Sequence, residues 1–262
     1  MGPPPQKMKI TRWHTGGNFQ LILQMIVTLT IIRYPRNWMA IPALLSMAFF
    51  HLPLMINRKI GFYKLMGTGK NGTFDKNPEW CQWAILAAYR SEFTGSTNLT
   101  PTLLYGNVIA GWFRLFRCET CTFYLQPIEG HGTWDGREPF GTLPKQSAYT
   151  GPVGILTRAT IRLSKAGRFW SHVEQVATRM AGADGFIFSI GIGEMPFLKQ
   201  ATFSIWKNKE SMHRFAYQLE EHADVIRKTR KEKWYSEDMF VRFIPLKVHG
   251  TIQGSNPLSG IA

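Results

Sequence analysis

The chain has 262 residues, which suffice for two small domains or for one duplicated domain with a substantial core. Its three cysteines exclude the disulfide framework of a small secreted domain, so we expect a cytoplasmic protein, peripheral on the inner membrane surface if it contacts a membrane at all. A formal net charge of +14 predicts attraction to a polyanion, and both nucleic acid and an anionic membrane surface satisfy that prediction.

The chain is expected to begin with an arm and a strand. Residues 1–24 contain no clean secretory signal and are expected to form a flexible arm, and the β-branched run 26–33 predicts a strand. The stretch 38–56 follows, nineteen residues without a formal charge, which is about the length that spans hydrocarbon. Because Pro42 and Pro53 interrupt it, a buried helix or a helix on the bilayer surface is favoured over a transmembrane span.

The chain repeats one pattern about 118 residues apart. Residues 61–69 are bounded by glycines and precede an Asn-Pro pair and Gln82, and residues 185–193 are bounded in the same way and precede a Met-Pro pair and Gln200. A strand-like run and a helical stretch come before each copy, so each half has the order of a βαββαβ ferredoxin-like unit. The sequence therefore predicts an α+β fold in which tandem ferredoxin-like repeats form a pseudo-dimeric α+β barrel, with an apolar interior where a ligand could lie.

The expected domain boundaries follow from this repeat. Between the copies lies a Gly- and Pro-rich segment that is either a lid over a pocket or ordinary surface structure. The predicted division is a first repeat at 25–127, an inter-repeat loop at 128–151, a second repeat at 152–245 and a C-terminal tail at 246–262.

One histidine is a candidate ligand because of its position on a predicted helix that begins near Lys209. The residues on one face of this helix, at spacings of three and four, are Met212, Phe215, Leu219, His222 and Ile226. An imidazole in an apolar cavity with no carboxylate on its face can be an axial ligand of haem iron. A hydrogen-bonded core histidine gives the same spacing, so both interpretations stay open.

Several motifs occur along most of the chain, from about Thr28 to Phe243, in the order and spacing of one family. They are Gly61–Gly69, Trp83–Leu86, Leu125–Ile128, Gly132-x-Trp134-x-Gly136-x-x-Pro139-Phe140, Leu156–Arg162, Phe169-Trp170, Gly191–Glu194, Gln200–Trp206, Met212-x-x-Phe215-Ala216-Tyr217, His222-x-x-Val225-Ile226-Arg227 and Trp234-x-x-Glu237. Together they resemble the spheroidene monooxygenase family of carotenoid oxygenases. The resemblance implies an oxygenase that inserts oxygen into an unactivated position of an acyclic carotenoid, giving a hydroxyl and, after a second oxidation, a ketone.

The resemblance also implies a cofactor and partners. The family is thought to use haem, here haem b, and relatives in the wider dimeric α+β barrel group hold haem iron through a helical histidine, a role that His222 matches. Phe215, Leu219 and Ile226 share its helix face and would line the haem, and Lys64 is a further pocket candidate. The expected partners are a lipophilic substrate, dioxygen and an electron donor such as ferredoxin.

Three residues are candidates for catalysis. Arg33 and Arg158 occupy corresponding strands of the two halves and could face a distal site if they point inward; outward salt bridges or lipid contacts are the alternative. Gln200 is a candidate because glutamine recurs at Gln82, although a repeated glutamine can also satisfy the same backbone groups twice.

Two other classes of function remain open. One is a haem barrel enzyme of the aldoxime dehydratase type, which would need no electron donor. The other is a non-catalytic barrel that binds lipid or nucleic acid. Nucleic acid is the less favoured partner, because the basic run 227–235 is typical of a solvated helix end. A homo-oligomer is left open.

Overall fold

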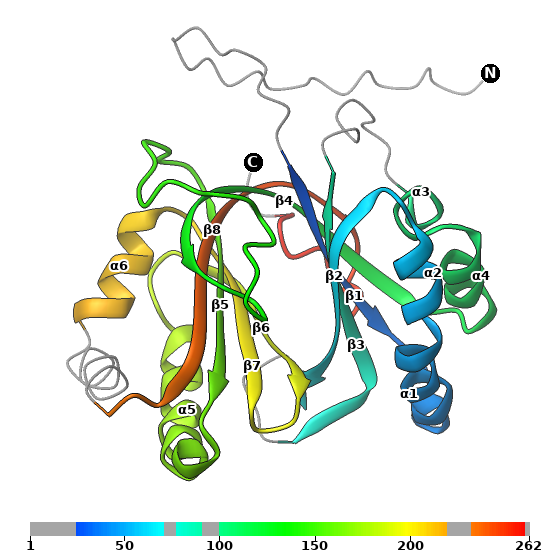
Figure 1. Cartoon of the computed structure of the whole chain (residues 1–262), viewed down its shortest axis with the longest axis horizontal. Coiled ribbons are helices and arrows are strands. Elements are labelled where there is room, and N and C mark those ends of the chain that lie inside the picture. The colour runs from blue at the N-terminus through cyan, green and yellow to red at the C-terminus, as the bar shows by residue number, and fades with distance from the viewer. Residues whose placement is uncertain (1–24, 71–76, 91–99, 219–231, 260–262) are drawn as a thin grey trace, which may run out of the picture.

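The computed structural model describes residues 25–70, 77–90, 100–218 and 232–259. Eight antiparallel strands close into a barrel in the order β1-β3-β2-β6-β7-β5-β8-β4 (Figure 1). The first four strands are β1 (Ile26–Arg33), β2 (Ile60–Gly69), β3 (Pro78–Tyr89) and β4 (Glu119–Gly132), and the second four are β5 (Val153–Ile161), β6 (Phe186–Met195), β7 (Lys199–Trp206) and β8 (Tyr235–Gly250). Within each set the order is second, third, first, fourth, which is the ferredoxin-like order. The predicted pseudo-dimeric α+β barrel is confirmed.

Helices cover the outside of both sets of strands (Figure 1). Repeat 1 consists of β1 to β4 with a 3₁₀ turn (Asn37–Met39), α1 (Ala40–Phe49), α2 (His51–Ile56), α3 (Pro101–Tyr105) and α4 (Asn107–Leu115). Repeat 2 consists of β5 to β8 with a second 3₁₀ turn (Leu163–Lys165), α5 (Ala166–Ala181) and α6 (Lys209–Gln218). The start of α3 is marked by Thr100, whose side chain accepts a hydrogen bond from the Leu103 amide, and by a proline in the first turn.

The two repeats are joined by one long and one short strand pairing. β4 and β8 pair along their length, from Cys121 opposite Gly250 to Gly132 opposite Met239. β2 and β6 pair only where Gly67 and its neighbour meet Gly193 and Ile192. The long pairing depends on strands that extend beyond their expected ends, because β4 continues past 127 and β8 continues past 245.

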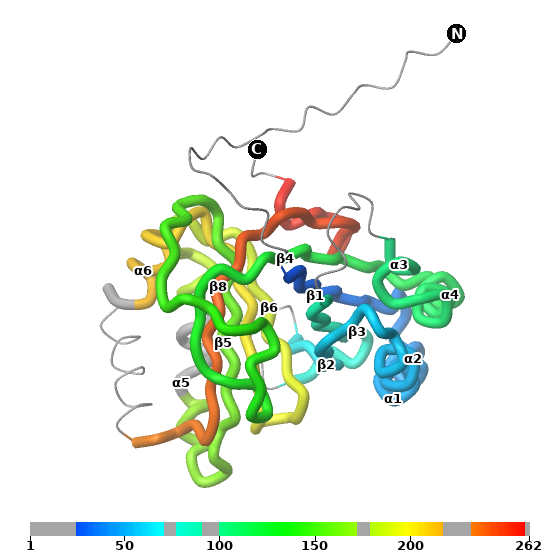
Figure 2. Tube along the Cα trace, turned by 45° about the horizontal axis from the view of Figure 1, so that its top comes forward, coloured from blue at the N-terminus to red at the C-terminus, as the bar shows by residue number. Residues whose placement is uncertain are grey.

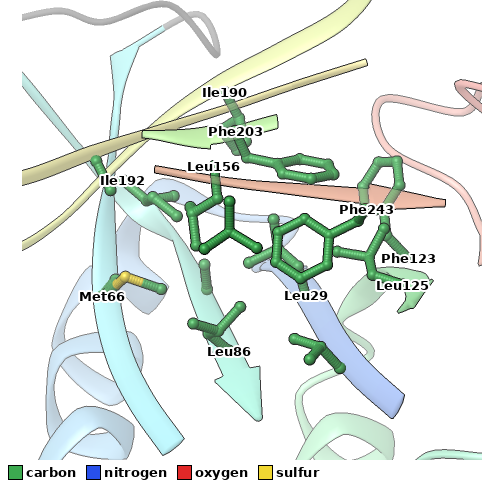
Figure 3. Packing of buried hydrophobic residues seen from close by; sticks show 14 of the residues in the cluster. Leu29, Met66, Leu86, Phe123, Leu125, Leu156, Ile190, Ile192, Phe203 and Phe243 are labelled. Atoms are coloured by element: carbon green, nitrogen blue, oxygen red, sulfur yellow. The ribbon is translucent and has the colours of Figure 1, made fainter. Parts of the chain in front are cut away.

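Packed side chains occupy the centre of the barrel (Figure 3). Alternate residues of each strand point inward, as in β1, where Val27, Leu29 and Ile31 belong to the barrel core. Phe123 lies 5.0 Å from Phe188 and about as close to Phe203, measured between ring centroids. The interior that was expected to hold a ligand is therefore a hydrophobic core, because large inward side chains from both repeats meet there.

The segment between the repeats is packed against the barrel. Trp134 is fully buried, and Phe140 is buried with its ring 5.4 Å from that of Phe243. These contacts exclude the alternative of a plain surface loop for this part of the segment, because its aromatic side chains belong to the barrel core.

Candidate active site

Six charged side chains meet at the end of the barrel where β5 ends and β8 begins. They are Lys64, Asp135, Arg158, Glu194, Lys199 and Glu237. Arg158 is almost completely buried; it donates to Glu237 and, at 3.3 Å, to Asp135. Lys64 donates to Asp135 and, at 2.5 Å, to Glu194. Three cations and three anions thus form a charge-balanced cluster, as burial of ionised groups requires.

Trp134 lies inside this charged cluster. Its indole Nε1 donates to Glu194 at 2.6 Å, and the guanidinium of Arg158 lies 5.5 Å from the ring centroid. The ring of Phe62 packs edge-on against it at 5.7 Å. The buried indole thereby lies between the ion pairs and the apolar core, and its ring contacts the cations of the cluster.

Two carboxyl groups of the charged cluster, those of Asp135 and Glu237, have lowered pKa values. Burial acts to raise the pKa of Asp135, but hydrogen bonds from Lys199 and Lys64 outweigh it and lower the pKa to about 2. Burial likewise opposes ionisation of Glu237, whose pKa is lowered to about 2 by the Gly136 amide, Thr133 and Arg158. Both carboxyls are therefore ionised and paired at neutral pH, which suits a structural role better than proton transfer.

The structure does not bring Arg33 to this cluster. Arg33 is the last residue of β1 and lies opposite Glu119 at the start of β4, beside the far end of β8. Arg158 lies opposite Met239, near the beginning of β8. The two arginines thus occupy opposite ends of the barrel. Arg158 points inward, as its candidacy required, but its guanidinium is engaged by carboxylates.

The two repeated glutamines face opposite sides of the sheet. Gln82 is buried and donates to Thr68 at 3.2 Å, on the side of the barrel interior. In β7 the inward residues are Ala201 and Phe203, so Gln200 faces outward, where it donates to the Met195 carbonyl at 2.9 Å. The expectation that these glutamines occupy equivalent places is wrong. The spacing from Pro78 to Gln82 lies within β3, whereas the same spacing from Pro196 to Gln200 starts in the turn before β7.

The outer face of repeat 2 is open over the middle of its sheet. Thr157 lies in the centre of β5, paired with strands on both sides, and is nevertheless exposed. In repeat 1 the corresponding outward residues of β1, Thr28 and Thr30, are fully buried beneath α3, where Tyr105 contacts their hydroxyls at 3.2 and 2.6 Å. The helices of repeat 1 therefore close over their sheet, whereas the part of repeat 2 that the structure describes leaves Thr157 open.

Small side chains form the floor of this opening. Phe240, Thr157, Thr202 and Gly191 lie opposite one another in a row across β8, β5, β7 and β6, and the last three are small. At one edge of the opening, Phe215 of α6 packs on Trp206 with 5.2 Å between ring centroids. We call this surface the outer-face opening. Along this row Thr157 is exposed, Thr202 and Phe240 are half-buried and Gly191 is buried.

The sequence-predicted site residues thus divide between the two sides of the sheet. Phe215 and Gln200 lie on the outer side with the opening, and Arg158 and Lys64 lie on the inner side in the charged cluster. The remaining ligand candidates, His222, Leu219 and Ile226, lie outside the described residues, as do the arm 1–24 and most of the basic run 227–235. Sequence reasoning missed Thr157, whose signal is its place among small residues in neighbouring strands.

The described part of the chain contains no group of three or more His, Cys, Asp and Glu side chains that could hold a metal ion. A haem needs fewer protein ligands than a bound metal ion does, because one axial side chain and an apolar surface can hold it. The floor of Thr157, Thr202 and Gly191, with Trp206 and Phe240 beside it, fits a flat apolar group.

The fold defines the class of protein. Two solved aldoxime dehydratases have the same barrel: one, in complex with butyraldoxime, has a TM-score of 0.55 at 7% identity over 87% of this chain and 80% of its own. The other has a TM-score of 0.50 at 10% identity over 92% of this chain and 84% of its own. The protein is thus a duplicated member of the dimeric α+β barrel class.

The sequence then defines the family. The chain is 34% identical over 238 residues to spheroidene monooxygenase of Rhodobacter capsulatus, covering 89% of this chain and 95% of that protein. It is 33% identical over 233 residues to spheroidene monooxygenase of Cereibacter sphaeroides, covering 88% and 70%. No protein-family model matches the chain. The chain belongs to the spheroidene monooxygenase family, and the protein is an oxidoreductase of the monooxygenase type.

Proposed function

We propose that this protein is a haem-dependent monooxygenase that inserts oxygen into an acyclic carotenoid or a similar lipophilic substrate, first as a hydroxyl and then as a ketone. The substrate class comes from the spheroidene monooxygenases that the chain resembles. The observation that supports a place for haem is the exposed Thr157 in the centre of a sheet whose counterpart in repeat 1 is closed.

The reaction requires a cofactor. Removal of hydrogen from a saturated carbon needs an oxidant that no side chain supplies. A bound haem would supply that oxidant from dioxygen and from electrons delivered by a donor such as ferredoxin. The protein would contribute binding, orientation and exclusion of water, which an apolar surface provides.

The proposal gives roles to residues around the outer-face opening. His222 follows α6 in the sequence and is our candidate for the iron ligand. Phe215, Trp206, Thr157 and Thr202 would contact the haem. Gln200 has a half-buried amide on the same side and would donate a hydrogen bond to a group bound there.

Residues on the inner side of the sheet have a different role in this proposal. Arg158 follows Thr157 directly and points the opposite way, into the charged cluster. Its ion pairs would hold β5 against β8 beneath the floor of the opening. Lys64 belongs to the same cluster, so neither residue is assigned a contact with haem.

The test is an absorption spectrum of the protein produced with a haem precursor, recorded before and after dithionite and carbon monoxide. We expect a Soret band that shifts with carbon monoxide in the wild type and is lost or displaced in His222→Ala. Thr157→Trp should lower haem content at least tenfold by filling the opening. Thr102→Trp, at an exposed threonine of α3 in repeat 1, is the control for a bulky substitution.

Activity separates this proposal from a dehydratase. Incubation with an acyclic carotenoid should give hydroxylated and ketone products only when a reductant and dioxygen are present. A folded, haem-supplied protein without a Soret band would overturn the haem assignment. Product formed without reductant would overturn the monooxygenase reaction.

A further inference from the structure

The helix pair α1–α2 exposes an unusual amount of apolar surface. Six side chains of this helix pair and of the 3₁₀ turn before it are more than half exposed: Trp38, Ile41, Leu45, Leu52, Met55 and Ile56. Only a narrow strip that includes Ala43, Phe50 and Leu54 is buried against repeat 1. We call the exposed side the α1–α2 apolar surface. A soluble monomer rarely leaves a contiguous patch of this kind uncovered, so the surface indicates a partner.

The apolar surface continues onto α4. Phe49, at the end of α1, is half exposed and lies 5.4 Å from Trp112 between ring centroids. On α4, Val108 and Leu115 lie one turn before and one turn after Trp112 on the same side of the helix, and both are exposed. α1, α2 and α4 lie together on the side of the molecule away from α5 and α6 (Figure 1).

Positive charge lies at the edges of this surface. Arg36 directly precedes the helix pair, Arg58 and Lys59 directly follow it, and Arg114 lies in the last turn of α4; all four are exposed. We call these four residues the basic rim. Residues 1–74 contain nine Lys and Arg and no Asp or Glu, the first acidic residue being Asp75. An apolar patch within a basic rim complements an anionic lipid surface.

A transmembrane span fits the structure less well. The segment Asn37–Ile56 is long and apolar enough to cross a membrane by length and composition, and 28% of its most apolar window is buried. In the structure it is divided into two helices, and Phe50 and Leu54 belong to the core beneath them. A span would remove these side chains from that core, whereas docking on a surface leaves them in place.

A second copy of the chain is also a poorer partner. In a two-fold dimer both subunits would use this same surface, so the basic rim of one subunit would face the basic rim of the other. Like charges facing each other oppose association. A bilayer that contains anionic lipid would instead attract the rim and accept the apolar side chains.

We infer that the α1–α2 apolar surface docks this protein on an anionic bilayer, with α1 and α2 lying in the plane of the interface. The basic rim contacts the headgroups, and Trp38 lies at the headgroup level. This docking does not depend on haem. If the proposed function holds as well, the orientation leaves the outer-face opening turned toward the aqueous phase, where a soluble electron donor has access to it (Figure 1).

The experiment is co-sedimentation of the full chain with vesicles of phosphatidylcholine alone and with about 30% phosphatidylglycerol. We expect binding to the anionic vesicles at low salt and at least tenfold weaker binding to the neutral ones. Leu45→Glu and Met55→Glu, singly and together, should weaken binding at least tenfold. Leu163→Glu, at an exposed leucine of repeat 2, is the matched control and should bind within about twofold of wild type.

Charge and folding are tested separately. Arg58→Glu with Lys59→Glu should abolish the preference for anionic lipid while circular dichroism remains that of the wild type. If Leu45→Glu lowers the thermal stability, Leu45→Gln replaces it at the same exposed position. Wild-type protein that ignores vesicles, or binding that the two apolar variants leave unchanged, would overturn the proposal. Resistance to carbonate extraction would show a span instead, and lipid-free dimers broken by Met55→Glu would show a second copy.

Discussion

Glu119 and Glu237 lie 118 residues apart and accept the same three kinds of hydrogen bond at opposite ends of the barrel. Glu237 accepts from the Thr133 hydroxyl at 2.7 Å and from the amides of Gly136 and Asp135 at 2.8 and 3.2 Å. Glu119 accepts from the Thr251 hydroxyl at 2.8 Å and from the amides of Gly254 and Gln253 at 2.7 and 3.1 Å. Each carboxylate therefore fixes a loop that follows the other repeat's last strand.

The two loops are copies that have diverged. Residues 132–140 and 250–258 share Gly, Thr, Gly and Pro at the same spacing, and the second loop extends from the end of β8 back toward the start of β4 (Figure 2). The two loops differ at their tips. Trp134 and Asp135 of the first loop belong to the charged cluster. The corresponding residues of the second loop are Ile252 and Gln253. The duplication supplied two similar barrel ends, and one of them acquired charge.

This divergence predicts unequal effects of the same substitution. Glu237→Gln removes one of the charged partners of the buried Arg158 as well as weakening the loop, so the free energy of unfolding should fall by about 3 kcal/mol. Glu119→Gln affects only the loop, and a loss of about 1 kcal/mol is expected. Urea unfolding at neutral pH measures both, and equal losses would contradict the distinction.

The outward threonines of the two central strands form a second matched pair. Thr30→Val removes the shorter of the two threonine contacts of the Tyr105 hydroxyl and the buried partner of the Thr122 hydroxyl, which should cost about 2 kcal/mol. Thr157→Val removes an exposed hydroxyl and should change the free energy of unfolding by less than about 0.5 kcal/mol. Thermal unfolding of the two variants compares them directly. A large loss at Thr157 would show that the outer-face opening is closed in solution.

The lowered carboxyl pKa values predict how stability depends on pH. Burial opposes ionisation of Glu129, but Lys209 and Arg242 bring its pKa to about 2, and Asp135 and Glu237 share that value. A carboxyl with a lower pKa in the folded state binds more protons when unfolded, so it stabilises the protein above its unfolded pKa. The stabilisation should therefore be complete above about pH 5 and be lost as the pH falls toward about 2.

A variant of Glu129 tests this pH dependence. Urea midpoints of the wild type should fall steadily between about pH 5 and pH 3, and Glu129→Gln should show a shallower fall because one of the titrating groups is gone. Glu138→Gln, at an exposed glutamate, is the control and should keep the wild-type slope. Parallel curves for Glu129→Gln and wild type would contradict the role of Glu129.

The sequence predicted the barrel because its repeat preserves the order of strands. It did not predict that inward side chains fill the barrel interior, or which side of the sheet each candidate residue faces. The glutamine spacing was misleading because it lies within β3 in repeat 1 but starts in the turn before β7 in repeat 2. The charged cluster draws Arg158, Asp135 and Glu237 from three separate segments, which spacing alone cannot bring together. One signal was accessible in the sequence: the Gly-Thr-x-x-Gly-x-x-Pro pattern at 132–139 recurs at 250–257, outside the expected second repeat.

The last prediction concerns the coupling between Arg158 and Glu237. Arg158→Gln leaves three carboxylates facing only Lys64 and Lys199, so the pKa values of Asp135 and Glu237 rise and the variant loses stability. The loss should be greatest near about pH 7 and should shrink as the pH falls through about 4, because protonation then removes the unpaired negative charge. The wild type loses its own stabilisation over the same range, so the two curves converge.

A double-mutant cycle distinguishes this coupling from general damage to the barrel. The double variant Arg158→Gln, Glu237→Gln should be more stable than the sum of the two single losses predicts, by about 1–3 kcal/mol. Each single variant leaves one charge of the pair without its partner, whereas the double variant has neither charge. The same cycle at Arg214 and Asp184, an exposed pair at 2.6 Å, should give less than about 0.5 kcal/mol. Additive losses at Arg158 and Glu237 would mean that the two side chains stabilise the barrel end independently, and the charged cluster would then not act as a unit.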